Sequence, residues 1–263
     1  RTNHQPRKEE SIRSSWVDRV KFGTTTTSES VDETAEEEDT SWISVISWNV
    51  LAHSYCSRIS QRNLPPEYQK VVFHPVRRKQ QILNILARLA TEEADILCLQ
   101  EVDMDEIGAS LRHLGWEGIE TPRQRNGGGS GTKVDSCIVY VNPEHWKIRE
   151  HRVVRFDDLA TLSTSESRQC VENHVSFLAT SNLQGLQQSF LRRNVGLIVR
   201  LEDIQTGKTF VLANTHLFWN PNFEYVKFCQ IHHLLQQARA LCTDDEPFVL
   251  CGDLNSKPLG TVY

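Results

Sequence analysis

Four short apolar runs that each end in polar side chains constrain the fold of this chain most strongly. The runs end at Asn49, at Glu101, at residues 214–216 (Asn-Thr-His) and at residues 253–255 (Asp-Leu-Asn). Short runs rich in Val and Ile between helical patterns are typical of buried strands in an α/β domain. Because such strands direct their ends toward one edge of a sheet, we expect these carboxylates, carboxamides and the imidazole to gather there.

The remaining periodicity predicts an alternation of strands and helices. Apolar runs predict strands at residues 43–50, 95–99, 136–141, 195–201, 209–214 and 248–251. Helical spacing predicts a helix after Pro75, a second from Asp105 to His113 with Asp105 as its cap, and a third over residues 223–241. We therefore expect an α/β domain.

Residues 1–40 differ in composition from the rest of the chain. Basic residues come first, and Thr, Ser, Asp and Glu follow with little apolar surface between them. Such a segment buries too little to offset the entropy lost on ordering, so we predict a disordered polar linker at residues 1–40 and a folded domain at residues 41–263. Within that domain, the Gly-rich segment 123–133 is predicted to be a surface loop, and residues 156–191 a polar insertion.

The charge balance excludes a chain that grips duplex DNA through many phosphates. The sequence has 29 Lys and Arg against 34 Asp and Glu, which gives a formal net charge of -5. Proteins that neutralise many DNA phosphates are usually basic, so any contact with nucleic acid is expected to be local and helped by a metal cation. The sequence has no run approaching the about 18 apolar residues of a membrane helix, so we expect no membrane partner.

The cysteines indicate a reducing compartment. Seven cysteines are scattered along the chain without a Cys-x-x-Cys pair. Cys98 and Cys251 lie inside apolar runs, where a free thiol packs as a small hydrophobic group. We therefore expect an intracellular protein, in the cytoplasm by preference, with the nucleus or an organelle left open.

The polar ends of the runs match the needs of phosphoester hydrolysis. Mg²⁺ usually takes one or two protein carboxylates, and Glu101 suits that role, with Asn49 holding the metal or its water. Asp253 is placed to orient or deprotonate an attacking water. The candidates for donating hydrogen bonds to the phosphate are Asn214, His216 and Asn255. Each residue alone is also explained by local capping of turns, and the recurrence at four run ends is what favours a site.

Four sequence blocks resemble the signature motifs of the endonuclease/exonuclease/phosphatase family. The blocks are Ser-Trp-Asn-Val-Leu-Ala (47–52), Cys-Leu-Gln-Glu-Val-Asp (98–103), Asn-Thr-His-Leu-Phe-Trp-Asn-Pro (214–221) and Gly-Asp-Leu-Asn-Ser-Lys-Pro (252–258). Their order and separations match that family. The first and third blocks resemble its branch of carbon-catabolite-repressor deadenylases, nocturnin, Angel proteins and 2′-phosphodiesterases. Four ordered blocks are a more specific signal than one motif.

The resemblance implies a four-layer α-β-β-α sandwich of the DNase I-like type, in which two β-sheets lie face to face and a metal site lies at one rim. It implies Glu101 as the Mg²⁺ ligand and His216 on the scissile phosphate. The residues that it implies around the metal and the attacking water are Asn49, Asp253 and Asn255.

The same resemblance implies an RNA substrate. The leading hypothesis is a 3′-to-5′ exoribonuclease that acts on poly(A) tails of mRNA and binds a single-stranded 3′ end. A 2′-phosphodiesterase, a cyclic-phosphate or nucleotide phosphatase, and a catalytically dead RNA-binding module are the alternatives, and the sequence does not identify any protein partner. Phe218 and Trp219 are interpreted as a stacking platform for a base, with a core role weighed equally. Arg78 and Lys133 are interpreted as surface charges outside the site.

The chain departs from the family pattern at its C-terminal end. Family members continue past the Gly-Asp-x-Asn block with further strands and a Ser-Asp-His block whose histidine is catalytic, whereas this sequence stops at Tyr263. We therefore expect a sandwich that lacks its last strands and a fragment that is inactive alone.

We predict that residues 1–263 alone fold incompletely, because missing strands would leave sheet edges and apolar faces uncovered. Circular dichroism and calorimetry should show a broad thermal transition, and hydrolysis of RNA should be absent. A soluble protein with a cooperative melt and full activity would contradict this expectation.

Overall fold

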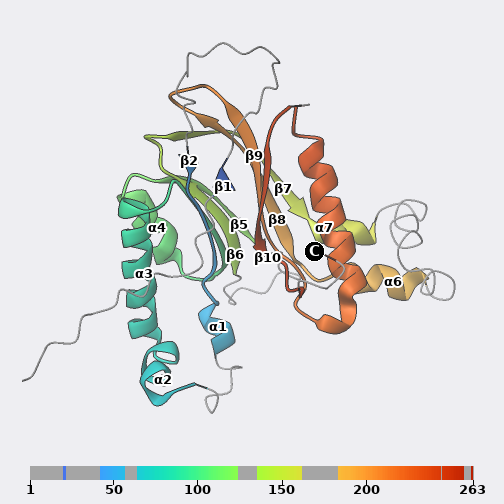
Figure 1. Ribbon diagram of the computed structural model, residues 1–263. Coiled ribbons are helices and arrows are strands. Elements are labelled where there is room, and N and C mark those ends of the chain that lie inside the picture. The colour runs from blue at the N-terminus through green and yellow to red at the C-terminus, as the bar shows by residue number, and fades with distance from the viewer. Residues whose placement is uncertain are drawn as a thin grey trace, which may run out of the picture.

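The computed structural model describes residues 20–21, 42–56, 64–123, 135–161, 183–243, 245–257 and 262. The described residues form a mixed α/β structure with two four-stranded sheets and a two-stranded pair (Figure 1), which confirms the predicted class. Within the predicted linker 1–40, the structure describes β1 (Val20–Lys21), which pairs antiparallel with β2 (Trp42–Ile43). The remainder of that prediction lies outside the described residues.

The first four-stranded sheet carries the ends of two of the apolar runs. Its strands are β3 (Val45–Asn49), β4 (Ile96–Val102), β6 (Ser136–Val141) and β5 (Glu117–Pro122), in that spatial order. β3 runs parallel to β4, and every residue of β4 is buried, which explains the apolar run at residues 96–99. The register pairs Asn49 with Gln100, so Asn49 lies next to the position of Glu101.

The second four-stranded sheet carries the ends of the other two runs. Its strands are β10 (Phe248–Asp253), β9 (Thr209–His216), β8 (Val195–Asp203) and β7 (Trp146–Arg155), in that spatial order. β10 runs parallel to β9, and the register pairs Asp253 with His216. β10 also contacts β3 and β4 of the first sheet. All four polar run ends therefore meet at neighbouring strand ends.

The sequence did not reveal β5 and β7, which are the strands with one neighbour at one side of each sheet. β5 reads Glu-Gly-Ile-Glu-Thr-Pro, and β7 has only two buried residues, Trp146 and Val154, with several charged, exposed ones between them. An edge strand buries little on its free side. Hydrophobic periodicity therefore gave no signal for either strand.

The three predicted helices are confirmed. They are α3 (Pro75–Glu92), α4 (Asp105–His113) and α7 (Glu224–Arg239). Met104, and not Asp105 as predicted, is the N-cap residue of α4, because Asp105 already has helical geometry. The shorter elements are α1 (His53–Cys56), α2 (Pro66–Val72), α6 (Leu183–Phe190), η2 (Phe156–Ala160) and η3 (Pro221–Phe223). Among the described helices, none has the length and apolar character needed to cross a membrane.

Two predicted irregular segments fall largely outside the described residues. Residues 124–133 of the Gly-rich segment lie outside them, as do residues 162–182 of the insertion. The described ends of the insertion carry η2 and α6, which contact each other. That segment therefore contains regular structure at both ends.

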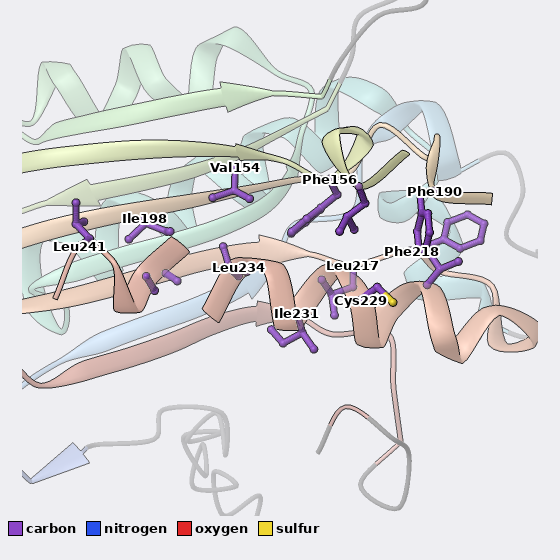
Figure 2. Close-up of a cluster of buried hydrophobic side chains, with 14 of the residues drawn as sticks. Val154, Phe156, Phe190, Ile198, Leu217, Phe218, Cys229, Ile231, Leu234 and Leu241 are labelled. Atoms are coloured by element: carbon purple, nitrogen blue, oxygen red, sulfur yellow. The ribbon is translucent and has the colours of Figure 1, made fainter. Parts of the chain in front are cut away.

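Three apolar clusters hold the sheets and helices together. The first cluster includes Cys98 and Val139 from the first sheet together with Leu212 from the second, so the two sheets pack against each other. The second joins the first sheet to α3 and α4. The third joins the second sheet to α7, with Ile198 and Leu234 among its members (Figure 2). Since both faces of each sheet bury apolar surface, the strand ends are where polar side chains can collect.

Gly252, directly before Asp253, occupies a position that only glycine fits. Its φ is +140°, and a Cβ placed there would lie 2.1 Å from the carbonyl oxygen of Thr215 on β9. We predict that Gly252→Ala lowers the free energy of unfolding by more than about 2 kcal/mol, because the overlap is with backbone that cannot move aside. Urea denaturation of the full-length protein measures the change.

Gly207→Ala is the matched control for this substitution. Gly207 also has a positive φ, +69°, but nothing lies within 4 Å of the position that a Cβ would take there. Only backbone strain applies at Gly207, so we expect a loss of about 1 kcal/mol. Equal losses for the two variants would show that the close approach of β10 to β9 has no energetic consequence.

Candidate active site

The side-chain nitrogen of Asn49 lies between two carboxylates that come from different sheets. Asn49 Nδ2 donates to Glu101 Oε1 at 2.9 Å and to Asp253 Oδ2 at 2.9 Å. The Asn49 side-chain oxygen accepts from the backbone N–H of Leu51 at 2.9 Å, which fixes the end of the amide that faces the carboxylates. Strands β3, β4 and β10 thus bring three residues predicted from the sequence to one point.

Glu101 is held in an uncommon backbone conformation near the end of β4. Its φ is +56°, and the register between β4 and β6 shifts between Leu99 and Val102. Its Oε2 atom accepts from the buried N–H of Ala52 at 3.0 Å. A non-glycine residue with positive φ costs on the order of 1 kcal/mol, and such strain is concentrated at functional sites. This irregularity in β4 therefore places the Glu101 carboxylate against the segment that follows β3.

Asp253 and Asn255 form a short turn that links the end of β10 to the end of β9. The backbone N–H of Asn255 donates to Asp253 Oδ1 at 2.9 Å, and the Asn255 side chain donates to the Leu217 carbonyl at 3.0 Å. The Leu217 N–H donates in return to the Asp253 carbonyl at 3.0 Å. Asn255 has a φ of +49°, a conformation that Asn adopts more readily than most residues. These bonds fix the rotation of the Asp253 carboxylate.

His216 faces both carboxylates without a hydrogen bond to either. Its Nδ1 lies 3.8 Å from Glu101 Oε1, and its Nε2 lies 3.8 Å from Asp253 Oδ2, which is beyond hydrogen-bonding distance. The buried Nδ1 has no hydrogen-bond partner within the described part of the chain. Burial lowers the pKa of His216, although the Asp253 and Glu101 carboxylates act in the opposite direction. Burial thus favours the uncharged imidazole, and its unpartnered Nδ1 can still form a hydrogen bond to a ligand.

The donor set at this point suits Mg²⁺. Two carboxylates share one amide donor, and their like charges repel each other when they are brought together. A divalent cation offsets that repulsion, and Mg²⁺ needs only one or two carboxylates because water and phosphate fill its other positions. Within the described ranges, no group of three or more His, Cys, Asp or Glu is placed to hold a metal ion. Glu101 remains the candidate Mg²⁺ ligand, with Asp253 beside it.

Arg78 has a different place from the one expected. The sequence indicated a surface charge, but Arg78 is 8% exposed and its Nη2 donates to the carbonyls of Val50 and Leu51. Leu51 has a φ of +56°, so the guanidinium stabilises a strained turn directly after Asn49. The expectation of a surface charge was wrong because backbone carbonyls, and not water, accept hydrogen bonds from the guanidinium. No sequence pattern predicts such backbone partners. Lys133, the other residue interpreted as a surface charge, lies outside the described residues.

Three further polar residues near His216 were missed by sequence reasoning. The buried Asp135 accepts from the Tyr55 hydroxyl at 2.9 Å, and Arg123 Nη1 lies 3.5 Å from the same carboxylate oxygen. Burial raises the pKa of Tyr55, and Asp135 raises it further. Arg123 lowers and Asp135 raises the pKa of His216, so both charges act at the site. Asp135 directly precedes β6, a strand that the sequence predicts, so polar residues at strand ends include it. Arg123 follows β5, which gave no periodic signal, and Tyr55 lies on α1.

Asn214, predicted to contact substrate, lies instead between the two sheets. It is fully buried, and its Nδ2 donates to the carbonyls of Leu99 at 3.1 Å and Ile138 at 2.8 Å. Its Oδ1 accepts from Gln100 Nε2 at 2.8 Å. Both amide hydrogens are therefore used, and none is left for a phosphate. We revise the prediction for Asn214 to a structural role that ties β9 to the first sheet.

The two aromatic residues after His216 differ in exposure. Phe218 is 8% exposed and belongs to the apolar cluster that packs against α7 (Figure 2). The Arg192 guanidinium lies 4.6 Å from the centre of its ring. Trp219 is 65% exposed, and its ring centre lies 6.0 Å from that of Phe218. Phe218 thus has the core role, and Trp219 is the residue with a ring face available for stacking.

Comparison with known proteins relates this geometry to a family. The model of the Endonuclease/Exonuclease/phosphatase family matches residues 46–263. The Carbon catabolite repressor protein 4 homolog 4 of Arabidopsis thaliana is 28% identical over 83% of this chain and 54% of its own length. The CCR4-Not complex 3′-5′-exoribonuclease subunit Ccr4 of Phaeosphaeria nodorum is 24% identical over 84% of this chain and 42% of its own length. The chain thus spans about half or less of these relatives.

Solved structures show the same relationship. ANGEL2, described as a 2′,3′-cyclic phosphatase and crystallised with adenosine-2′,3′-vanadate, is 26% identical with a TM-score of 0.59, over 82% of this chain and 54% of that one. The human Nocturnin catalytic domain with bound sulfate is 23% identical with a TM-score of 0.56, over 84% of this chain and 67% of that one. At that identity, the similarity to Nocturnin concerns the fold alone.

We predict that Asn214→Ala lowers the free energy of unfolding by about 2 to 3 kcal/mol, because two carbonyls and the Gln100 amide lose a buried partner. Urea denaturation of the full-length protein measures this loss of unfolding free energy.

Trp219→Ala is the contrasting variant. An exposed ring contributes little to stability, so we expect a nearly unchanged unfolding free energy, together with RNA binding weakened by about 1 to 3 kcal/mol for the lost stacking. If Asn214→Ala weakened binding without affecting stability, Asn214 would belong to the substrate site after all.

Proposed function

The chain belongs to the endonuclease/exonuclease/phosphatase family, and from that premise we propose that it is a Mg²⁺-dependent phosphodiester hydrolase. One observation carries the proposal: Asn49 Nδ2 bonds at 2.9 Å to Glu101 and at 2.9 Å to Asp253. His216 lies 3.8 Å from each of these carboxylates. Carboxylates that bind a cation and position a water, beside a neutral imidazole, are the groups that phosphoester hydrolysis uses.

Each of these residues has a proposed role. Glu101, oriented by Asn49, holds the metal ion, which when bound supplies positive charge to the phosphate oxygens. Asp253, whose rotation is fixed by the Asn255 N–H, orients the attacking water and accepts its proton. His216 donates a hydrogen bond to the phosphate, a contact typically worth about 10²- to 10³-fold in rate.

The proposed substrate is the single-stranded 3′ end of RNA, with poly(A) tails of mRNA as the leading case. The support is the similarity to fungal proteins described as 3′-5′-exoribonuclease subunits, such as that of Phaeosphaeria nodorum at 24% identity. Cleavage from that end releases nucleoside 5′-monophosphates. Trp219, exposed just beyond the end of β9, is suited to stacking on a terminal base.

A cyclic-phosphate end is the second candidate substrate. The similarity to ANGEL2, described as a 2′,3′-cyclic phosphatase, at 26% identity and a TM-score of 0.59 favours it. The groups around Asn49 recognise a phosphate and not a base, so the same residues would serve either reaction. A 2′-phosphodiesterase and a catalytically dead RNA-binding module are tested by the same experiment.

We also propose the family's four-layer α-β-β-α arrangement and a cytoplasmic location. The apolar clusters between the two sheets and between each sheet and its helices support the layering. The cysteines in the described ranges are free, which is typical of a reducing compartment.

To distinguish the substrates, the full-length protein is incubated with poly(A), with 2′,5′-oligoadenylate and with RNA that ends in a 2′,3′-cyclic phosphate. Each substrate is tested with Mg²⁺ and then with EDTA. We expect poly(A) to be shortened from its 3′ end in a reaction that EDTA stops. Glu101→Gln should lower kcat by at least about 10²-fold, while Glu117→Gln, an exposed glutamate elsewhere, should not change it.

Preferential hydrolysis of the cyclic phosphate would replace the deadenylase proposal with the second candidate. RNA binding without hydrolysis of any of the three substrates would establish the binding module. Full activity in EDTA, or in Glu101→Gln, would overturn the metal-dependent reaction itself.

A further inference from the structure

Lys227 on α7 is a lysine with almost no exposed surface. It is 1% exposed, and its Nζ donates to Glu224 Oε1 on the same helix and to the Asn255 carbonyl at 2.7 Å. Lysine is almost never fully buried, because its ammonium loses its hydration there and only well-made contacts offset the loss. An apolar side chain of similar length would pack in this position without that cost. The contact with Asn255 is therefore the feature that needs an explanation.

Gln230 lies three residues further along α7 and points the same way. It is fully buried, and its Oε1 accepts from the Phe218 N–H at 2.9 Å. Among the buried residues described for α7, Lys227 and Gln230 are polar and the others are apolar. These two side chains reach the segments that directly follow His216 at the end of β9 and Asp253 at the end of β10. α7 thus contacts the backbone on both sides of the candidate site.

Asn255 is hydrogen-bonded through its backbone N–H, its side chain and its backbone carbonyl. Its N–H bonds Asp253, its side chain bonds the Leu217 carbonyl, and its own carbonyl bonds Lys227. The φ of +49° is one that a residue leaves readily when its contacts are lost. Glu224 completes the arrangement, since its second oxygen accepts from the Ser256 hydroxyl at 3.3 Å.

We propose that Lys227 is a positioning residue for the hydrolysis proposed above, on which this inference rests. By holding the Asn255 carbonyl, Lys227 keeps the Asn255 N–H on Asp253 Oδ1. That bond in turn fixes the rotation of the Asp253 carboxylate, whose other oxygen bonds Asn49. Lys227 touches neither the substrate nor the metal, and it acts through Asn255 and Asp253.

A purely structural role makes a different prediction. Replacing a buried charged pair by a well-packed apolar group is often neutral for stability, and Glu224 is partly exposed and can be solvated alone. If Lys227 served only stability, activity would change only as the folded fraction changed. If it positions Asp253, activity and the order of the turn change while the fold is kept.

The test is Lys227→Met in the full-length protein, with three measurements. Amide hydrogen exchange of Asn255, followed by NMR, should accelerate at least about 10-fold, because the peptide loses its carbonyl partner. In steady-state kinetics on poly(A) with Mg²⁺, kcat should fall about 10- to 100-fold while KM changes less than about 2-fold, since substrate binding is not touched. The urea midpoint of unfolding should stay close to that of the unaltered protein.

Lys79→Met is the matched control. Lys79 also pairs with a glutamate, Glu106, at 2.8 Å, but on the surface of α3 and α4 with both side chains exposed. We expect no change in Asn255 exchange or in kcat. Should Lys227→Met fail to fold, Lys227→Gln, which is polar but too short to reach the Asn255 carbonyl, is measured in the same way with the same expected direction.

Unchanged Asn255 exchange in the folded variant would overturn the inference, and so would a loss of kcat that only follows the loss of folded protein. These outcomes are separate from the failure of the proposed function. If the unaltered protein hydrolyses none of the offered substrates, the proposed function fails, whereas Asn255 exchange still decides whether Lys227 holds the turn.

Discussion

The candidate site depends on one amide nitrogen that is shared by two carboxylates. Asn49 and Asp253 are separated by 204 positions in the chain, and their contact exists because strands of two different sheets end side by side. A negative pair held by a neutral amide keeps most of its mutual repulsion. The arrangement therefore favours a bound cation, and the apolar clusters that pack the sheets and helices supply the free energy that keeps the two carboxylates together.

Backbone strain and buried polar contacts are concentrated at this point. Among the described residues, four that are not glycine have a positive φ, and three of them, Leu51, Glu101 and Asn255, belong to the segments that carry the site. Buried side chains bond to two of these residues: Arg78 donates to the Leu51 carbonyl, and Lys227 donates to the Asn255 carbonyl. The Gln100–Asn214 contact ties the sheets together just behind the site. A rigid surround of this kind keeps charged groups in a geometry that they would not adopt freely.

Much of this arrangement follows from the sequence. The helices at residues 75–92, 105–113 and 224–239 follow from apolar periodicity, and the polar residues at strand ends predicted the meeting of Asn49, Glu101, His216, Asp253 and Asn255. The sequence did not predict at which residue of β9 the site begins. Asn214 and His216 lie on the same face of β9, because side chains alternate along a strand, yet Asn214 is still between the sheets. Arg78 and Lys227 were also hidden, since their partners are backbone carbonyls distant in the sequence.

The position of a bound divalent ion tests most directly whether Glu101 and Asp253 form a metal site. Crystals of the full-length protein, grown with Mn²⁺ in place of Mg²⁺, would locate the ion by its anomalous scattering. We expect a peak at ligand distance from the Glu101 carboxylate and next to Asp253 and His216, and no such peak in crystals of Glu101→Ala. An ion bound elsewhere, or coordinates in which Glu101 and Asp253 lie apart, would contradict it.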